Sequence, residues 1–176
     1  MKISVIIPTL NEESHIEKTL QSVTKQDGDY EFSVVDGGST DKTITIAKKY
    51  TTVINSRRGR AIQMNTGAKA CSGDILLFLH ADTILPDNAF REIRKRMKDD
   101  TLAGGSFYIA FDADTFILRG VSFITRFNFR LFHFGDQGIF VRRSIFQKLN
   151  GYKEMPIMED YDFYKRLGRQ GKVILI

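Results

Sequence analysis

The sequence has 176 residues, 42% of them hydrophobic and 27% charged, which is typical of one globular domain with a sizeable core. Its net charge of +5 suits an anionic ligand, but the basic residues are scattered except at 57–60 and 91–98, which argues against a nucleic-acid-binding protein. A single cysteine excludes an internal disulfide and a cysteine-based metal cluster. Because neither a signal peptide nor a membrane-spanning run is visible, we expect a cytoplasmic protein.

Strands and helices are predicted to alternate over the first eighty residues. Short apolar runs predict strands at 3–7, 32–35, 52–55 and 75–79, with Pro8 stopping the first. Helical spacing predicts helices at 14–23, after 37–41 through residue 48, and at 60–70. This alternation is typical of an α/β protein with a mostly parallel, Rossmann-like sheet flanked by helices and joined by right-handed crossovers.

Two of these helices carry candidate N-terminal caps. Ser14 and Glu17 have the spacing of a capping box, and Ser39 or Thr40 could cap the helix that follows.

The second half of the chain is less regular. Its pattern predicts helices at 86–98, 143–149 and 159–167, and strands at 102–111, 139–141 and 173–176. The chain ends on a bare apolar strand, from which we expect a truncated protein. Phenylalanines alternate with arginines over 116–134, and two interpretations stay open: packing in the core or against a second subunit of a homodimer, and peripheral contact with acidic lipid at the inner face of the membrane.

Three of the predicted parallel strands end in polar loops, at 8–12, 36–39 and 80–82. Because the carboxyl ends of parallel strands meet at one sheet edge, these loops predict a ligand site there. Asp36 could accept hydrogen bonds from a nucleotide base or ribose, while Gly37 and Gly38 let a ligand approach the backbone; a simple Asx-type turn is the alternative. Asp82 could hold a hard cation that binds phosphate, or merely cap the next turn.

Two common nucleotide-binding motifs are absent from the sequence. No G-x-G-x-x-G follows the first strand, and no G-x-x-x-x-G-K-[ST] occurs, which argues against hydride transfer and the usual ATP hydrolysis.

The motifs together resemble those of family 2 glycosyltransferases, which are inverting enzymes with the A-type fold. The resemblance rests on the segments 8–12, 36–41, 60–68, 80–82, 135–138 and 158–160, which follow in the family's order over nearly the whole chain. It implies one glycosyltransferase domain over 1–176, with a nucleotide-sugar-binding half at 1–83 and an acceptor and catalytic half at 84–176. His80-Ala81-Asp82 resembles a bacterial subgroup of the family, in which cell-envelope polysaccharides are made, and His80 stands where an aspartate is usual.

The resemblance also implies a role for each motif residue. The residues implied to bind the nucleotide are Pro8, Thr9, Asn11, Glu12, Asp36, Gly37, Gly38, Arg60, Asn65, His80 and Ala81. Asp82 would bind Mg²⁺ or Mn²⁺ on the diphosphate, and Asp136 and Gln137 would line the acceptor side.

Asp160 resembles the family's catalytic base, with Glu159 as the carboxylate beside it. Such a base takes the proton of the acceptor hydroxyl as that oxygen attacks the anomeric carbon. From local sequence alone, residues 159–162 could equally be the solvated acidic start of a helix.

The sequence therefore predicts a metal-assisted, inverting glycosyltransferase. Its donor would be a nucleotide-diphospho-sugar, most simply a UDP-sugar by analogy with the family. The acceptor is left open between a saccharide, a lipid and a small molecule. A nucleotidyltransferase and a non-catalytic nucleotide-sugar-binding domain are the alternatives; the first would want a glycine-rich loop with a basic residue after the first strand, which residues 8–12 lack.

Overall fold

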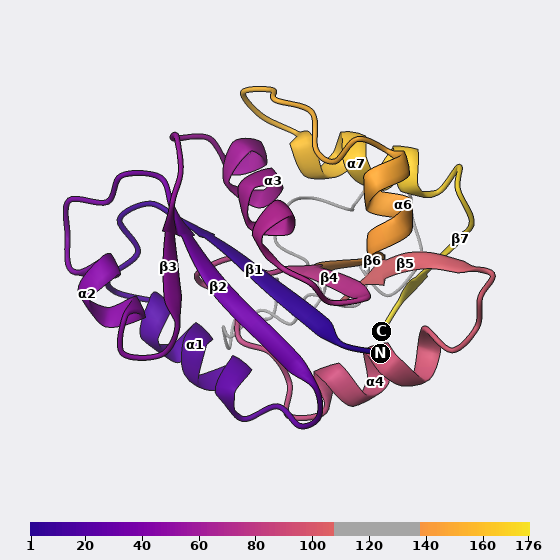
Figure 1. Cartoon of the computed structure of the whole chain (residues 1–176), viewed down its shortest axis with the longest axis horizontal. Coiled ribbons are helices and arrows are strands. Elements are labelled where there is room, and N and C mark those ends of the chain that lie inside the picture. The colour runs from indigo at the N-terminus through magenta and orange to yellow at the C-terminus, as the bar shows by residue number, and fades with distance from the viewer. Residues whose placement is uncertain (108–137) are drawn as a thin grey trace, which may run out of the picture.

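The computed structural model describes residues 1–107 and 138–176 (Figure 1). Within these ranges seven strands form one sheet in the order β3-β2-β1-β4-β6-β5-β7. The strands are β1 (Ile3–Thr9), β2 (Tyr30–Asp36), β3 (Thr52–Asn55), β4 (Ile75–Phe78), β5 (Leu102–Ser106), β6 (Ile139–Arg142) and β7 (Lys172–Leu175). Strands β1 to β4 pair in parallel, and β6 runs antiparallel between β4 and β5. The predicted α/β fold with a mostly parallel sheet is confirmed.

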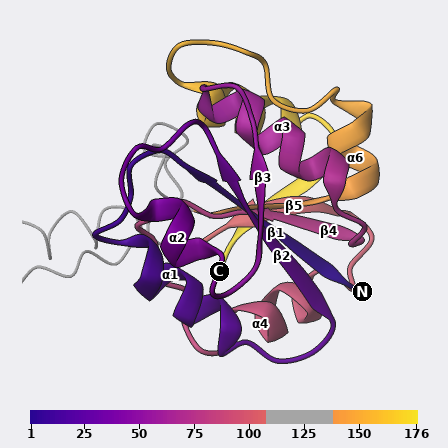
Figure 2. The ribbon, with the colours of Figure 1, turned by 60° about the vertical axis from the view of Figure 1, so that its left-hand side comes forward.

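Helices cover both faces of the sheet (Figures 1 and 2). One face carries α1 (Ile16–Thr24), α2 (Thr43–Ala47) and α4 (Ala89–Arg96), and the other carries α3 (Arg60–Ala70), α6 (Arg143–Lys148) and α7 (Glu159–Leu167). Each face has its own hydrophobic cluster, because successive strand residues point to opposite sides. Strand β1 is buried along its whole length, which explains its nearly continuous apolar sequence.

The first strand is longer than predicted, because it continues through Pro8 to Thr9. The Thr9 carbonyl accepts from Gly37 N on the β2 side, so the preceding Pro8 faces the β4 side. Pairing between β1 and β4 ends at Ile6 and Phe78. The missing N–H of Pro8 therefore interrupts no ladder hydrogen bond.

Both predicted helix caps are wrong. Helix α1 begins at Ile16 and α2 at Thr43, and neither has a side-chain hydrogen bond at its N-cap. The hydroxyl of Ser39 is instead bonded within the loop, to Asp36. The predicted helix at 86–98 begins only at Ala89, and the predicted strand at 102–111 is described as far as Ser106, its last residues lying outside the described ranges.

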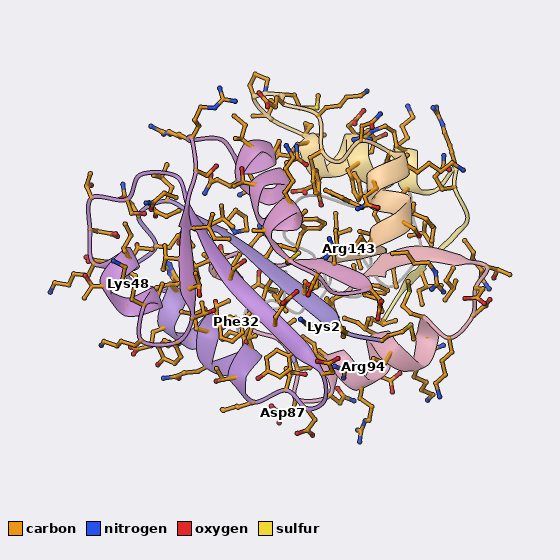
Figure 3. All side chains as sticks on the ribbon, viewed as in Figure 1. Lys2, Phe32, Lys48, Asp87, Arg94 and Arg143 are labelled. Carbon is orange, nitrogen blue, oxygen red and sulfur yellow. The ribbon has the colours of Figure 1, made fainter. Side chains whose placement is uncertain are left out.

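Three arginines close the edge of the sheet at which the parallel strands begin. Arg94 donates to the carbonyls of Met1, Asp27 and Asp29. Arg142 donates to those of Met97, Asp99 and Leu102, and Arg143 to those of Ala68 and Gly73. Arg94 and Arg143 are labelled with Lys2 in Figure 3. This edge is thus occupied by structural bonds.

None of the helices in the described part of the chain has both the length and the apolar character needed to cross a membrane.

Glu31, at the same edge of the sheet, should make the stability of the protein depend on pH. Burial opposes ionisation of Glu31, but hydrogen bonds from Lys2, Ser4 and Ser72 outweigh it and lower the pKa of Glu31 to about 2. A lowered folded-state pKa contributes stability above the ordinary value of 4.5, and this contribution is lost as the pH falls towards 2. We expect Glu31→Gln to cost about 1–2 kcal/mol at pH 7, allowing for solvent screening, and to flatten the acid loss of stability.

Urea unfolding between pH 2 and 7 measures this effect. Glu154→Gln is the control, since Glu154 makes an exposed ion pair with Arg57 at 3.8 Å. Equal stabilities of Glu31→Gln and the parent chain at pH 7 would contradict the expectation.

Candidate functional site

The loops after β1 and β2 are bonded to each other at the edge where these strands end. Ser39 Oγ accepts from Asn11 N at 2.9 Å, and Asn11 Oδ1 accepts from Thr40 N at 2.8 Å. Glu12 N donates to Thr43 Oγ1 at 2.7 Å. Asn11 has φ of 56°, a left-handed conformation that asparagine tolerates better than most residues. The two predicted nucleotide-binding loops therefore form one unit.

Asp36 organises the turn that follows β2. Its Oδ2 accepts from Gly38 N at 2.7 Å and Ser39 N at 2.9 Å, and its Oδ1 accepts from Ser39 Oγ. The residue is 2% exposed. The Asx-type turn, which was the alternative interpretation of this segment, is therefore present. Binding of a ribose or base by Asp36 stays a prediction.

Gln63 of α3 holds the ends of both strands. Its Nε2 donates to the carbonyls of Thr9 and Val35, each at 2.8 Å. A Cβ on Gly37 would lie 3.0 Å from Gln63 Oε1, so the glycine leaves room for this amide. Gln63 is buried, and its place in the sequence does not indicate this role, because a glutamine within a helix usually lies on the surface.

The third predicted loop begins where β4 ends. His80 and Ala81 are buried, and the Ala81 carbonyl accepts from Thr19 Oγ1 of α1 at 2.7 Å. Asp82 is exposed, and its Oδ1 accepts a long hydrogen bond of 3.4 Å from Thr83 Oγ1. The strand thus ends in a fixed backbone with one accessible carboxylate.

Four charged or titratable side chains meet across α3, the end of β4 and α7. Arg60 Nη1 lies 3.8 Å from Asp160 Oδ2, and Arg60 Nε lies 3.6 Å from Glu159 Oε1. His80 Nε2 lies 3.6 Å from the same Asp160 Oδ2. Glu159 and Asp160 are each 6% exposed, so they are not the solvated helix start that was the alternative.

Met158, the N-cap of α7, has φ of 69°. This conformation is uncommon for a residue with a long side chain, and such strain gathers at functional sites.

Asn65 has a role that the sequence did not indicate. Its Nδ2 donates to the Tyr152 carbonyl at 2.8 Å, and its Oδ1 accepts from Tyr152 N at 2.9 Å. This pair fixes the backbone of Tyr152 against α3. Its implied place beneath a nucleotide stays a prediction, as do the acceptor roles of Asp136 and Gln137 and the contacts of 116–134, which lie outside the described residues.

The described residues offer a divalent cation one suitable ligand, Asp82, but not a complete ligand set. Within 1–107 and 138–176 no three His, Cys, Asp or Glu side chains are grouped to hold a metal ion. The accessible carboxylate of Asp82 supplies the hard oxygen that Mg²⁺ and Mn²⁺ prefer, and Mg²⁺ is commonly bound by one or two carboxylates together with substrate phosphates and water. Asp82 therefore suits a cation that arrives with a diphosphate.

The comparisons with known proteins agree on one family. The family model described as glycosyl transferase family 2 matches residues 4–162. A "PGL/p-HBAD biosynthesis glycosyltransferase" of Mycobacterium tuberculosis is 31% identical over 182 residues, which cover 91% of this chain and 67% of that relative.

Solved structures share the fold. The mannosyltransferase PcManGT from Pyrobaculum calidifontis, in complex with GDP-Man and Mn²⁺, has a TM-score of 0.80 at 23% identity over 99% of this chain. Residues 1–349 of TarS from S. aureus, in complex with UDP-GlcNAc, also reach 0.80, at 20% identity over the full chain. The match spans 54% of the first solved chain and 56% of the second.

The position of Gln63 generates a second test. We expect Gln63→Leu to destabilise the protein by about 2–3 kcal/mol, because two buried carbonyls lose a donor. Gln147→Leu, which replaces an exposed glutamine of α6, should change stability by less than about 0.5 kcal/mol. Thermal and urea unfolding measure both variants, and equal effects of the two substitutions would show that the Gln63 amide does not hold the loops.

Proposed function

Because this chain belongs to glycosyltransferase family 2, we propose that it moves a sugar from a nucleotide-diphospho-sugar to an acceptor hydroxyl, with inversion and with Asp160 as the base. The observation that carries the proposal is the buried Asp160 carboxylate, placed between Arg60 and His80 beside the end of β4. In this proposal residues 1–83 bind the donor, and 84–176 carry the base and face the acceptor.

The reaction is a single displacement. The acceptor oxygen forms a bond to the anomeric carbon while the bond from that carbon to the diphosphate breaks. The acceptor proton passes to a carboxylate oxygen of Asp160, and the nucleoside diphosphate leaves with the bonding electrons. Inversion follows because the attacking oxygen enters opposite the leaving group.

Arg60 and His80 hold Asp160 from two sides. Arg60 is half-exposed, so its guanidinium can contact both the carboxylate and a charged ligand from solvent. A positioned cation of this kind stabilises negative charge that develops on a leaving diphosphate. Glu159 shares Arg60 with Asp160, and the guanidinium offsets part of the repulsion between the two carboxylates.

Asp82 is the residue that would hold Mg²⁺ or Mn²⁺. A bound cation supplies neutralisation of the charge that builds on the departing nucleoside diphosphate. The solved relatives carry different donors, GDP-Man in PcManGT and UDP-GlcNAc in TarS. We propose a UDP-sugar as the first donor to test on this chain.

Asp160→Asn tests the base. We expect the rate of nucleoside diphosphate release from the donor to fall by about 10²–10⁴-fold, because an amide accepts no proton, while donor binding is retained. Asp162→Asn is the matched control on the same helix, since that carboxylate pairs with Arg166 at 2.6 Å and Lys153 at 3.1 Å instead. Turnover that survives Asp160→Asn would remove Asp160 as the base, and donor binding without any turnover of the parent chain would favour a non-catalytic binding domain.

Asp82→Ala tests the cation. Calorimetric titration with a panel of nucleoside diphosphates should show tighter binding with Mn²⁺ than without it, and this difference should disappear in Asp82→Ala. Asp87→Ala, which removes an exposed carboxylate five residues further on, should keep the difference. Binding that ignores both Mn²⁺ and Asp82 would point to a metal-independent site.

A further inference from the structure

We propose that Tyr152 is a positioning residue for Asp160, and that its hydroxyl donates a hydrogen bond to the Asp160 carboxylate during the reaction. The inference rests on the proposed function, because it takes Asp160 as the base. It concerns a residue that none of the sequence motifs includes.

The Tyr152 hydroxyl is buried beside the acidic residues of α7. The residue is 2% exposed, and its oxygen has no partner with normal hydrogen-bond geometry among the described residues. Buried hydroxyls almost always have a partner, so this one calls for an explanation. The charges of Asp160 and Glu159 act on this hydroxyl, and the Asp160 carboxylate is the acceptor within its reach.

The aromatic neighbours of Tyr152 leave its ring little freedom. The ring stacks on that of Phe163 of α7, with ring centroids 4.3 Å apart. It also meets the ring of Phe78 of β4 edge to face, with ring centroids 4.9 Å apart. Phe163 lies three residues after Asp160, on the same buried face of α7. A ring held on Phe163 therefore carries its hydroxyl along the face that bears Asp160.

The backbone of Tyr152 is fixed as firmly as its ring. The two hydrogen bonds to Asn65 hold its N–H and carbonyl against α3. Gly151 has φ of 67°, and a Cβ there would lie 2.4 Å from Asn65 Oδ1, so the glycine allows this close approach. Helix α3 thus supports Asp160 twice, directly through Arg60 and indirectly through Asn65 and Tyr152.

The groups around Asp160 differ in what they can supply. Arg60 comes from α3, His80 from the end of β4, and Glu159 from α7 itself. Burial raises the pKa of Tyr152 well above its usual range, and the charges of Asp160 and Glu159 raise it further. Tyr152 therefore stays a neutral donor throughout the pH range in which enzymes work.

A hydrogen bond to the charged carboxylate stabilises that form, so its removal makes the carboxylate easier to protonate. The assay follows kcat for nucleoside diphosphate release from the donor as a function of pH. We expect Tyr152→Phe to move the acidic limb of this pH profile upward by about one pH unit and to lower kcat at pH 7.5 by about tenfold. The affinity for the nucleoside diphosphate selected from the panel should not change. The ring packing is kept, so the unfolding temperature should stay close to that of the parent chain.

Tyr164→Phe is the matched control. Tyr164 lies on α7 and is partly buried, and its hydroxyl interacts with Ser106 rather than with Asp160. Its removal should leave the acidic limb in place. A purely structural role of buried tyrosine hydroxyls would instead affect both variants alike, and this outcome would overturn the proposal.

Asp160→Asn, measured in the same assay, distinguishes a wrong base assignment from a wrong role for Tyr152. If Asp160→Asn retains turnover, the proposed base is wrong, whatever Tyr152→Phe does. If Asp160→Asn abolishes turnover while Tyr152→Phe keeps the parent pH profile and kcat, only the role of Tyr152 is wrong. Asn65→Leu tests the role of Tyr152 in a second way. Because this substitution releases the Tyr152 backbone, it should move the acidic limb upward, as Tyr152→Phe does.

Discussion

The parallel pairing of β1 with both β2 and β4 is the constraint on which the site depends. It aligns Thr9 with Asp36 and Ile6 with Phe78, so three loops that are far apart in the sequence leave the sheet at one edge. Because β1 is buried on both faces, a slip of its register would move its side chains between the two hydrophobic clusters and disrupt the packing of both. The position of the polar loops is therefore a consequence of the core.

Periodicity located the elements well, because buried parallel strands are apolar runs and the helices between them keep one apolar face. The predicted cap at Ser39 or Thr40 is wrong because both residues bond within the loops, Ser39 to Asp36 and Asn11 and Thr40 to Asn11, and the local sequence pattern does not show the contact with Asn11. The strand-end loops and the buried acidic pair could be located from motifs. Gln63 could not, since its partners are backbone carbonyls without a side-chain signature.

Helix α3 connects parts of the site that the strands alone would leave independent. Within six residues, Arg60 reaches α7, Gln63 holds the ends of β1 and β2, and Asn65 fixes the loop before α7. These three side chains keep fixed relative positions, because the helix backbone is held rigid by its own hydrogen bonds. The loops at the strand ends and the acidic pair on α7 therefore share one rigid support.

The arginine-closed edge bears on how this chain can be re-engineered. Exchanging arginines for lysines is a common way to alter solubility or crystallisation while the net charge is kept. Arg94 and Arg142 each reach three carbonyls, and Arg143 reaches two, through the planar fork of the guanidinium. A lysine ammonium cannot span the same set, so a charge-neutral recoding of the surface has to leave these three positions untouched.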